Sequence, residues 1–150
     1  MPWVSVTRLR LRGWFFLPAF LFTNGPVARQ VRKAPGFLGG TLMMDARHTF
    51  WTVSLWKDQA SMAAFRNGGK HGKAMPKLAG WAEHTRVANW EQEGKSIPDW
   101  ETLYTRLSEK GRPSRLFRPA PDHKGPNDFP RPRQEGWRMR ALDPIGPKAP

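Results

Sequence analysis

HTFWTVSLWKDQASMAAFRNGGKHGKAM, residues 48–75, is the stretch of the chain that decides the fold. Its first half alternates apolar and polar side chains, as a strand does when its two faces differ. Asp58 then supplies a favourable N-cap, and the apolar residues that follow recur with helical spacing. The stretch therefore predicts a strand over residues 50–56 that is followed directly by a helix over residues 59–82.

The helical half contains Gly68, Gly69 and Gly72 around one histidine, His71. Glycine in a helix interior costs roughly 1 kcal/mol relative to alanine. Two explanations stay open: the helix breaks at this point, or something approaches the backbone closely beside an imidazole. A helical projection places His71 and Met75 on the stripe that faces the sheet.

The flanking segments extend this strand–helix pair into a longer alternating pattern. Residues 3–12 alternate with period two, and we expect the arginines at the end of this strand to reach water. The pattern continues with a helix over residues 16–33, a strand over 37–46 and a last strand over 84–90. The order β-α-β-β-α-β predicts an α+β, ferredoxin-like domain over residues 1–92, with a four-stranded antiparallel sheet and both helices on one face.

The rest of the chain divides into two further segments. Residues 93–111 contain a short amphipathic helix, with Ser96 as its N-cap, Asp99 three residues later and Gly111 as its C-cap. Residues 112–150 hold nine of the 15 prolines and no sustained periodicity. This composition predicts a basic, proline-rich, extended tail that is dispensable for folding.

Composition limits the possible functions. The absence of cysteine excludes disulfides, thiolate catalysis and cysteine-based metal sites. The most apolar run, residues 14–22, is too short to span a bilayer, and we expect a soluble protein in the cytoplasm. The net charge of +13 is spread along the chain and permits nucleic acid, anionic lipid or acidic ligands without selecting one. The sequence contains no HExxH, P-loop or GxGxxG motif.

His71 is the candidate functional residue, with two interpretations. It is either a hydrogen-bonded structural histidine, or an acid/base or metal-ligating group in a pocket between the helix and the sheet. In the second case we expect Trp51, Phe65 and Met75 to line the same pocket and bind the substrate. Desolvation would keep the imidazole of His71 largely neutral.

PGFLGG at residues 35–40, the stretch at 48–75 and the closing Asn89-Trp90 together resemble the antibiotic-biosynthesis-monooxygenase-like dimeric α/β-barrel superfamily. Within it, the chain looks most similar to spheroidene monooxygenase-like proteins. The resemblance covers about residues 3–92. It implies a homodimer whose sheets pack face to face, with a ligand cavity between the sheet and helices of each subunit.

The resemblance also implies an activity. It suggests a monooxygenase that acts on a hydrophobic aromatic or polyene small molecule, either without a cofactor or with a haem whose axial ligand is His71. One alternative is a non-enzymatic dimeric barrel that binds a small ligand. Another is an RNA-binding module of the RRM type, which shares the element order. Nucleic acid is disfavoured, because TFWTVSLW lacks the basic-glycine start and closely spaced aromatics of an RNP1 motif.

Overall fold

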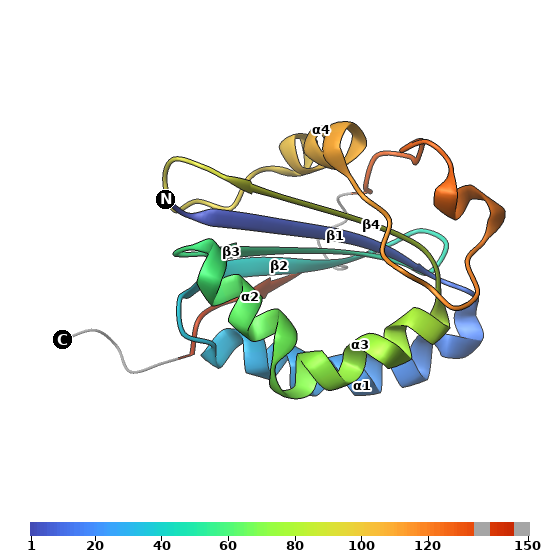
Figure 1. Ribbon diagram of the computed structural model, residues 1–150, viewed down its shortest axis with the longest axis horizontal. Coiled ribbons are helices and arrows are strands. Elements are labelled where there is room, and N and C mark those ends of the chain that lie inside the picture. Colours follow the sequence, from blue (N-terminus) through green and yellow to red (C-terminus); the bar gives the residue numbers. More distant parts are fainter. Residues whose placement is uncertain (134–138, 146–150) are drawn as a thin grey trace.

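The protein is described from a computed structural model, which covers residues 1–133 and 139–145. It has three layers, with a twisted sheet between helices on both sides (Figure 1). One side carries η1 (Trp14–Phe16), α1 (Leu17–Lys33), α2 (Gln59–Asn67) and α3 (Gly69–Trp81). The opposite side carries α4 (Trp100–Lys110) and the segment that follows it. Within the described residues, no helix combines the length and the hydropathy required to cross a bilayer.

The strands are β1 (Trp3–Leu11), β2 (Phe37–Asp45), β3 (Thr49–Trp56), β4 (Ala82–Glu91) and β5 (Met139–Leu142). They form one antiparallel sheet in the order β4-β1-β3-β2-β5. The ferredoxin-like element order is therefore confirmed. The predicted number of four strands is wrong, because β5 from the C-terminal segment pairs with the free edge of β2. An open edge presents unpaired N–H and C=O groups, and a fifth strand satisfies them.

The single helix predicted over residues 59–82 is also wrong, because it breaks into α2 and α3 at Gly68. Gly69 has a φ of +54°, a conformation that glycine adopts without strain. The side chain of Gln30 in α1 fills the break: its amide donates to the Gly68 carbonyl at 3.0 Å and its oxygen accepts from the His71 N–H at 2.7 Å. A Cβ on Gly69 would lie 3.1 Å from Gln30 Nε2. The glycines thus mark a capped break between two helices.

The sheet face opposite α1–α3, hereafter the α4 face, is covered by the same chain. Leu103 and Leu107 of α4 and Phe129 pack with Trp51 and neighbouring strand residues in one buried cluster. We predicted that a second subunit would cover this face, since a four-stranded sheet cannot leave an apolar face wet. The premise of that argument is wrong for this chain, because its own C-terminal residues provide the cover.

The start of α4 also differs from the prediction. Asp99, not Ser96, is the N-cap, and its side chain accepts a hydrogen bond from the Thr102 N–H at 2.8 Å. The helix ends as predicted, with Gly111 at the C-cap position. The two residues between Ser96 and Asp99, Ile97 and Pro98, lie outside the helix.

The segment after α4 packs along β4 and does not extend freely into solvent. Its backbone exchanges hydrogen bonds between Arg112 and Val87, and Ala120 donates to the Glu83 carbonyl. His123 and Phe129 are 4% and 6% exposed. These contacts run against the expectation of a dispensable tail. The prolines of this segment lack a backbone N–H donor, but they do not prevent the segment from packing against the surface of the sheet.

Candidate functional site

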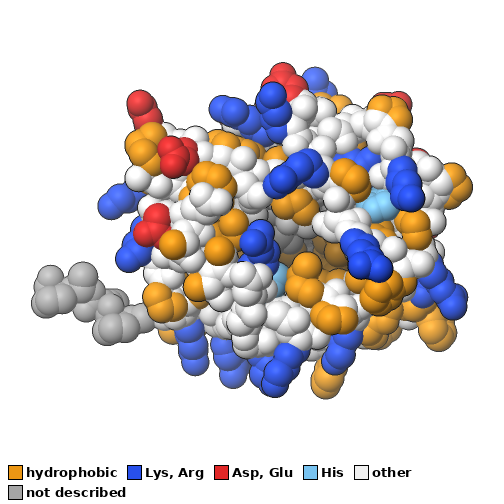
Figure 2. Space-filling view, in the orientation of Figure 1, with side chains coloured by type: hydrophobic (Ala, Val, Ile, Leu, Met, Phe, Trp, Pro, Cys, Tyr) orange, Lys and Arg blue, Asp and Glu red, His pale blue; other side chains and the backbone are white. Residues whose placement is uncertain are grey.

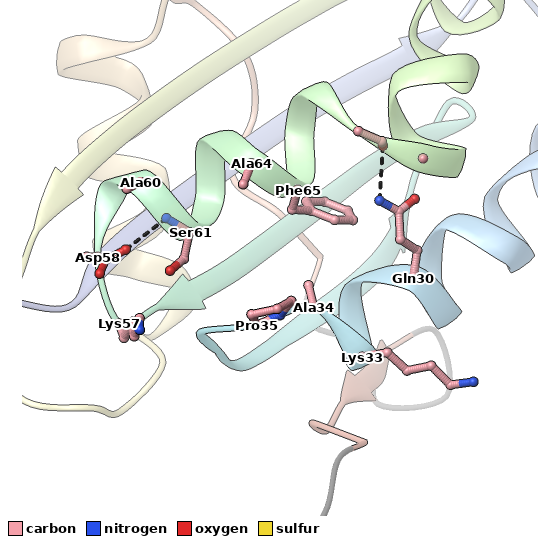
Figure 3. A pocket seen from close by; sticks show the side chains of 12 residues that line it. Gln30, Lys33, Ala34, Pro35, Lys57, Asp58, Ala60, Ser61, Ala64 and Phe65 are labelled. Atoms are coloured by element: carbon pink, nitrogen blue, oxygen red, sulfur yellow. Dashed lines mark hydrogen bonds between the residues drawn. The ribbon is translucent and has the colours of Figure 1, made fainter.

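An open groove of about 730 Å³ lies between the C-terminal end of α1 and α2 (Figure 3). Its described lining comes from three places: the last turn of α1 and the residues after it, the start of α2, and the break between α2 and α3. The lining residues are Gln30, Lys33, Ala34, Pro35, Lys57, Asp58, Ala60, Ser61, Ala64, Phe65, Gly68 and Gly69.

Local sequence explains why this space stays open. Ala60 and Ala64 are one helical turn apart on α2 and present only methyl groups to the groove. Asp58 fixes the start of α2 by accepting a hydrogen bond from the Ser61 N–H at 2.8 Å. Phe65 supplies the aromatic surface, and its ring packs on the buried ring of Trp56 at 5.3 Å between centroids. The result is a mainly apolar groove with Lys33 and Lys57 in its lining.

His71 lies beside this groove, behind Phe65. The two ring centroids are 4.7 Å apart, but the groove lining does not include His71. Its Nδ1 lies 2.9 Å from the Arg66 carbonyl oxygen. Since a carbonyl can only accept, Nδ1 must carry the proton, which leaves a lone pair on Nε2 of the neutral ring. Burial lowers the pKa of His71, so the neutral form dominates near pH 7.

The structure brings together two of the four predicted site residues. Phe65 and His71 are in contact. Trp51 is fully buried on the α4 face, where its Nε1 donates to Asp45 Oδ2 at 3.1 Å, so the sheet separates it from His71. Met75 is 41% exposed and lies one helical turn from His71 on α3. The prediction that Trp51 shares a pocket with His71 was therefore wrong, and Met75 does not line the groove.

The residues present do not fit a haem in this groove. Axial ligands in haem proteins are His, Cys, Met or Tyr, and the described lining contains none of them. A second hollow beside residues 113–124 includes His123, but both of its ring nitrogens are used: Nδ1 accepts from the Thr85 N–H and Nε2 donates to the Ser114 carbonyl. No cluster of three metal-ligating side chains occurs among the described residues.

The α4 face holds a second group of chemically unusual residues, which the sequence reasoning missed. Arg8 and Arg86 are directly opposite each other in the β1–β4 register and are 4% and 1% exposed. The guanidinium of Arg8 lies 4.8 Å from the ring centre of Phe129 and donates to Nδ1 of His84 at 3.4 Å. Within the described residues it has no carboxylate partner, and its Nε has no acceptor. Burial lowers the pKa of Arg8 to about 10, and that of His84 to about 4.

The neighbouring arginine is paired. Arg10 binds Glu83 at 2.7 Å and makes a bidentate pair with Asp122 at 2.9 and 3.0 Å. Arg8 and Arg10 were expected to reach water, and that expectation was wrong. Because side chains alternate along a strand, Arg8 and Arg10 lie on the same face of β1 as Val4 and Val6, which are buried. This alternation was the signal in the sequence that the two arginines lie on a buried face. Such a buried cation could hold an anion, but Phe129 lies against it here.

Part of the chain matches a known protein family in sequence, and its fold matches solved structures. Residues 25–77 match the family model for antibiotic biosynthesis monooxygenase, and no curated protein matches the sequence. The chain is similar in structure to Rv0793 from Mycobacterium tuberculosis, with a TM-score of 0.58 at 10% identity over 65% of this chain and 100% of that one. It is also similar to SnoaB from Streptomyces nogalater, a cofactor-independent oxygenase, with a TM-score of 0.52 at 16% identity over 65% and 98%.

A conserved protein from Methanosarcina mazei gives a TM-score of 0.57 at 11% identity, over 62% of this chain and 94% of that one. Identities this low establish the fold alone, whereas the family match comes from the sequence. Together they confirm the predicted superfamily. The family model covers residues 25–77, about a third of the chain, and the solved structures share its fold. The nearer resemblance to spheroidene monooxygenase-like proteins stays a prediction.

Proposed function

We propose that the protein is a monooxygenase that binds a hydrophobic aromatic or polyene small molecule in the groove beside Phe65 and works without a resident haem. The observation that carries the proposal is the fixed tautomer of His71, whose Nδ1–H donates to the Arg66 carbonyl at 2.9 Å. The family match and the description of SnoaB as a cofactor-independent oxygenase support it.

The chemistry required of the protein is modest. Removing the proton from a phenol or an activated C–H leaves an electron-rich carbon to which dioxygen adds. The resulting hydroperoxide loses water to leave a carbonyl, so the substrate itself supplies the electrons for both oxygen atoms. A neutral imidazole with a free lone pair on Nε2 is a suitable proton acceptor. Lys33 and Lys57 in the groove lining would stabilise the anion that forms. Phe65 would orient a flat substrate by ring contact.

Two alternatives to a monooxygenase remain. The first is distinguished by whether the substrate is turned over, and the second by whether aromatic side chains of the sheet are exposed. A non-enzymatic binding protein would use the same groove, so substrate binding without product would favour it. The RNA-binding alternative loses support, because the aromatics available for base stacking, Phe50, Trp51 and Trp56, are 3%, 0% and 0% exposed. A cytoplasmic location and a homodimer stay predictions.

The test is a panel of phenolic and polyene compounds, assayed for binding by fluorescence and for oxygen uptake. We expect His71→Ala to lower kcat by 100-fold or more, on the order of a lost general base, while leaving binding within about threefold. Phe65→Ala should weaken binding instead. Activity of the wild type should fall as pH drops below about 6.5, because His71, whose pKa is lowered by burial, becomes protonated in that range and can no longer accept a proton.

Met75→Ala is the matched control, because Met75 lies on the same helix but is exposed. Met75→Ala should change neither kcat nor the affinity for the substrate. Unchanged kcat in His71→Ala would contradict the proposed base. A haem titration that gives a Soret band lost in His71→Ala would contradict the haem-free part of the proposal.

A further inference from the structure

Large apolar side chains are exposed at the end of the molecule where η1 leads into α1. Phe15 and Phe22 are 89% and 86% exposed, and Trp14 and Leu21 are 57% and 51% exposed. These four residues, called the apolar tip, occur within nine positions of the sequence. Exposed apolar side chains gathered in this way mark an interaction site more often than scattered ones do.

The tip is held firmly against the body. Phe16, between the exposed residues, packs in the core with Leu17, and the guanidinium of Arg12 lies 4.3 Å from its ring centre. The Arg12 N–H donates to the Trp81 carbonyl at 2.8 Å. The Trp14 ring stacks edge-on against His48 with 5.2 Å between centroids. The exposure of the tip is therefore built into the fold.

The outward side of α1 changes character along its length. Phe20, Val27 and Val31 are buried against the sheet. On the opposite side of the helix, Phe22 is followed at helical spacing by Arg29 and Lys33, which are exposed. Seven residues separate Phe22 from Arg29, a rise of about 10 Å along the axis. The apolar residues and the cations are thus successive zones of one surface.

The neighbouring helix extends the cationic zone. Lys70, Lys73 and Lys77 of α3, which packs beside α1, are exposed, and with Arg29 and Lys33 they form the basic flank. The sequences of α1, α2 and α3 contain seven lysines and arginines and no aspartate or glutamate. Figure 2 shows Lys and Arg side chains along the helical edge of the molecule, while Asp and Glu gather on the opposite side.

We propose that this surface docks on an anionic lipid bilayer, with the apolar tip entering the interface and the basic flank contacting lipid phosphates. With the tip directed at the bilayer, Phe22 would enter the interface while Arg29, about 10 Å further along the α1 axis, would stay near the lipid phosphates. A second copy is a poorer partner, since two flanks without acidic residues repel each other. Nucleic acid would favour cations interleaved with aromatics, whereas here they are separate zones.

The experiment is co-sedimentation of the full chain with phosphatidylcholine vesicles, with and without phosphatidylglycerol. We expect binding to the anionic vesicles that weakens as salt is raised. Phe15→Ser combined with Phe22→Ser should lower partitioning by roughly tenfold or more per residue. Lys70→Gln, Lys73→Gln and Lys77→Gln together should lower it on the order of a hundredfold for anionic vesicles only.

Lys95→Gln, Lys110→Gln and Lys124→Gln together are the charge-matched control, because these three exposed lysines flank or follow α4 on the other side of the sheet. It should bind like the wild type. Equal binding by the Phe15/Phe22 variant, or equal losses in the control, would overturn the proposal. So would self-association of the wild type, seen by light scattering without lipid, that the two serine substitutions abolish.

Discussion

On the α4 face of the sheet, Trp51 and Phe129 are buried and pack edge-on with 6.0 Å between ring centroids, and even an arginine is enclosed beside them. On the helix face, Phe65 has one side against Trp56 and the other toward an open groove. Both faces use aromatic rings, but only one leaves a ring accessible to a ligand. The difference teaches that the α4 face serves stability, while the groove between the helices leaves an aromatic ring open to a ligand.

Truncation after Gly111 is the strongest way to break this comparison. It removes β5, Phe129 and the Asp122 carboxylate that pairs with Arg10. Losing one buried Phe alone costs about 3–5 kcal/mol, against a total stability of about 5–15 kcal/mol. We expect no cooperative thermal transition by circular dichroism. The control is Arg131→Gln, whose exposed pair with Glu101 should matter by less than about 1 kcal/mol. A truncated chain that melts like the full one would show that the α4 face needs no cover from this segment.

Phe129→Ala and Phe65→Ala sharpen the comparison with one substitution on each face. We expect Phe129→Ala to lower the free energy of unfolding by about 3–5 kcal/mol, because it leaves a cavity among Trp51, His84 and Tyr104. Phe65→Ala should cost about half as much, since the groove already exposes part of the ring. Urea titration measures both. A larger loss at Phe65 would reverse the assignment of the two faces.

His84 should make the stability of the α4 face depend on pH. Its pKa is lowered from 6.5 to about 4 by burial and then by Arg86 and Arg8. The unfolded chain therefore binds more protons between these values, and stability should fall as pH drops from about 7 to about 4. Chemical unfolding at several pH values measures the slope. His84→Asn should flatten it, and an unchanged slope would mean that other groups account for the effect.

Arg8→Met is the subtlest test. Arg8 has no carboxylate partner within the described residues, and replacing such a buried cation with an apolar side chain of similar length is often neutral or stabilising, here by about 0–2 kcal/mol. Thermal unfolding would show an equal or higher midpoint. A clear loss of stability would mean that the contacts of Arg8 with Phe129 and His84 outweigh the desolvation of its charge.

The sequence was sufficient for the element order and most strand positions, because strand alternation and helix spacing are local signals. At Gly68 it left two explanations open, and the choice between them depends on Gln30, a residue 38 positions away that reaches across from α1. It failed for β5, whose four residues form a strand only because β2 offers them an open edge. Local pattern carries no information about such distant partners.

Only the part of the candidate site that depends on residues close in the sequence could be predicted. Phe65 and His71 come together because they lie six residues apart around one helix end. Trp51 was assigned to the wrong side, although its alternation partner Phe50 was correctly placed on the other face. Choosing the inner face requires knowing that both faces of this sheet are covered. Period two alone separates the two sets of side chains without saying which set meets the helices.

Among the described strands β5 comes last in the sequence, so it is synthesised after the other four. At about 5–20 residues per second, roughly 5–20 seconds pass between the synthesis of β2 and that of its edge partner. During that interval the outer edge of β2 is open to neighbouring nascent chains. We expect yield in the cell to depend on translation speed through the second half of the message, with slow codons there favouring aggregation over native protein.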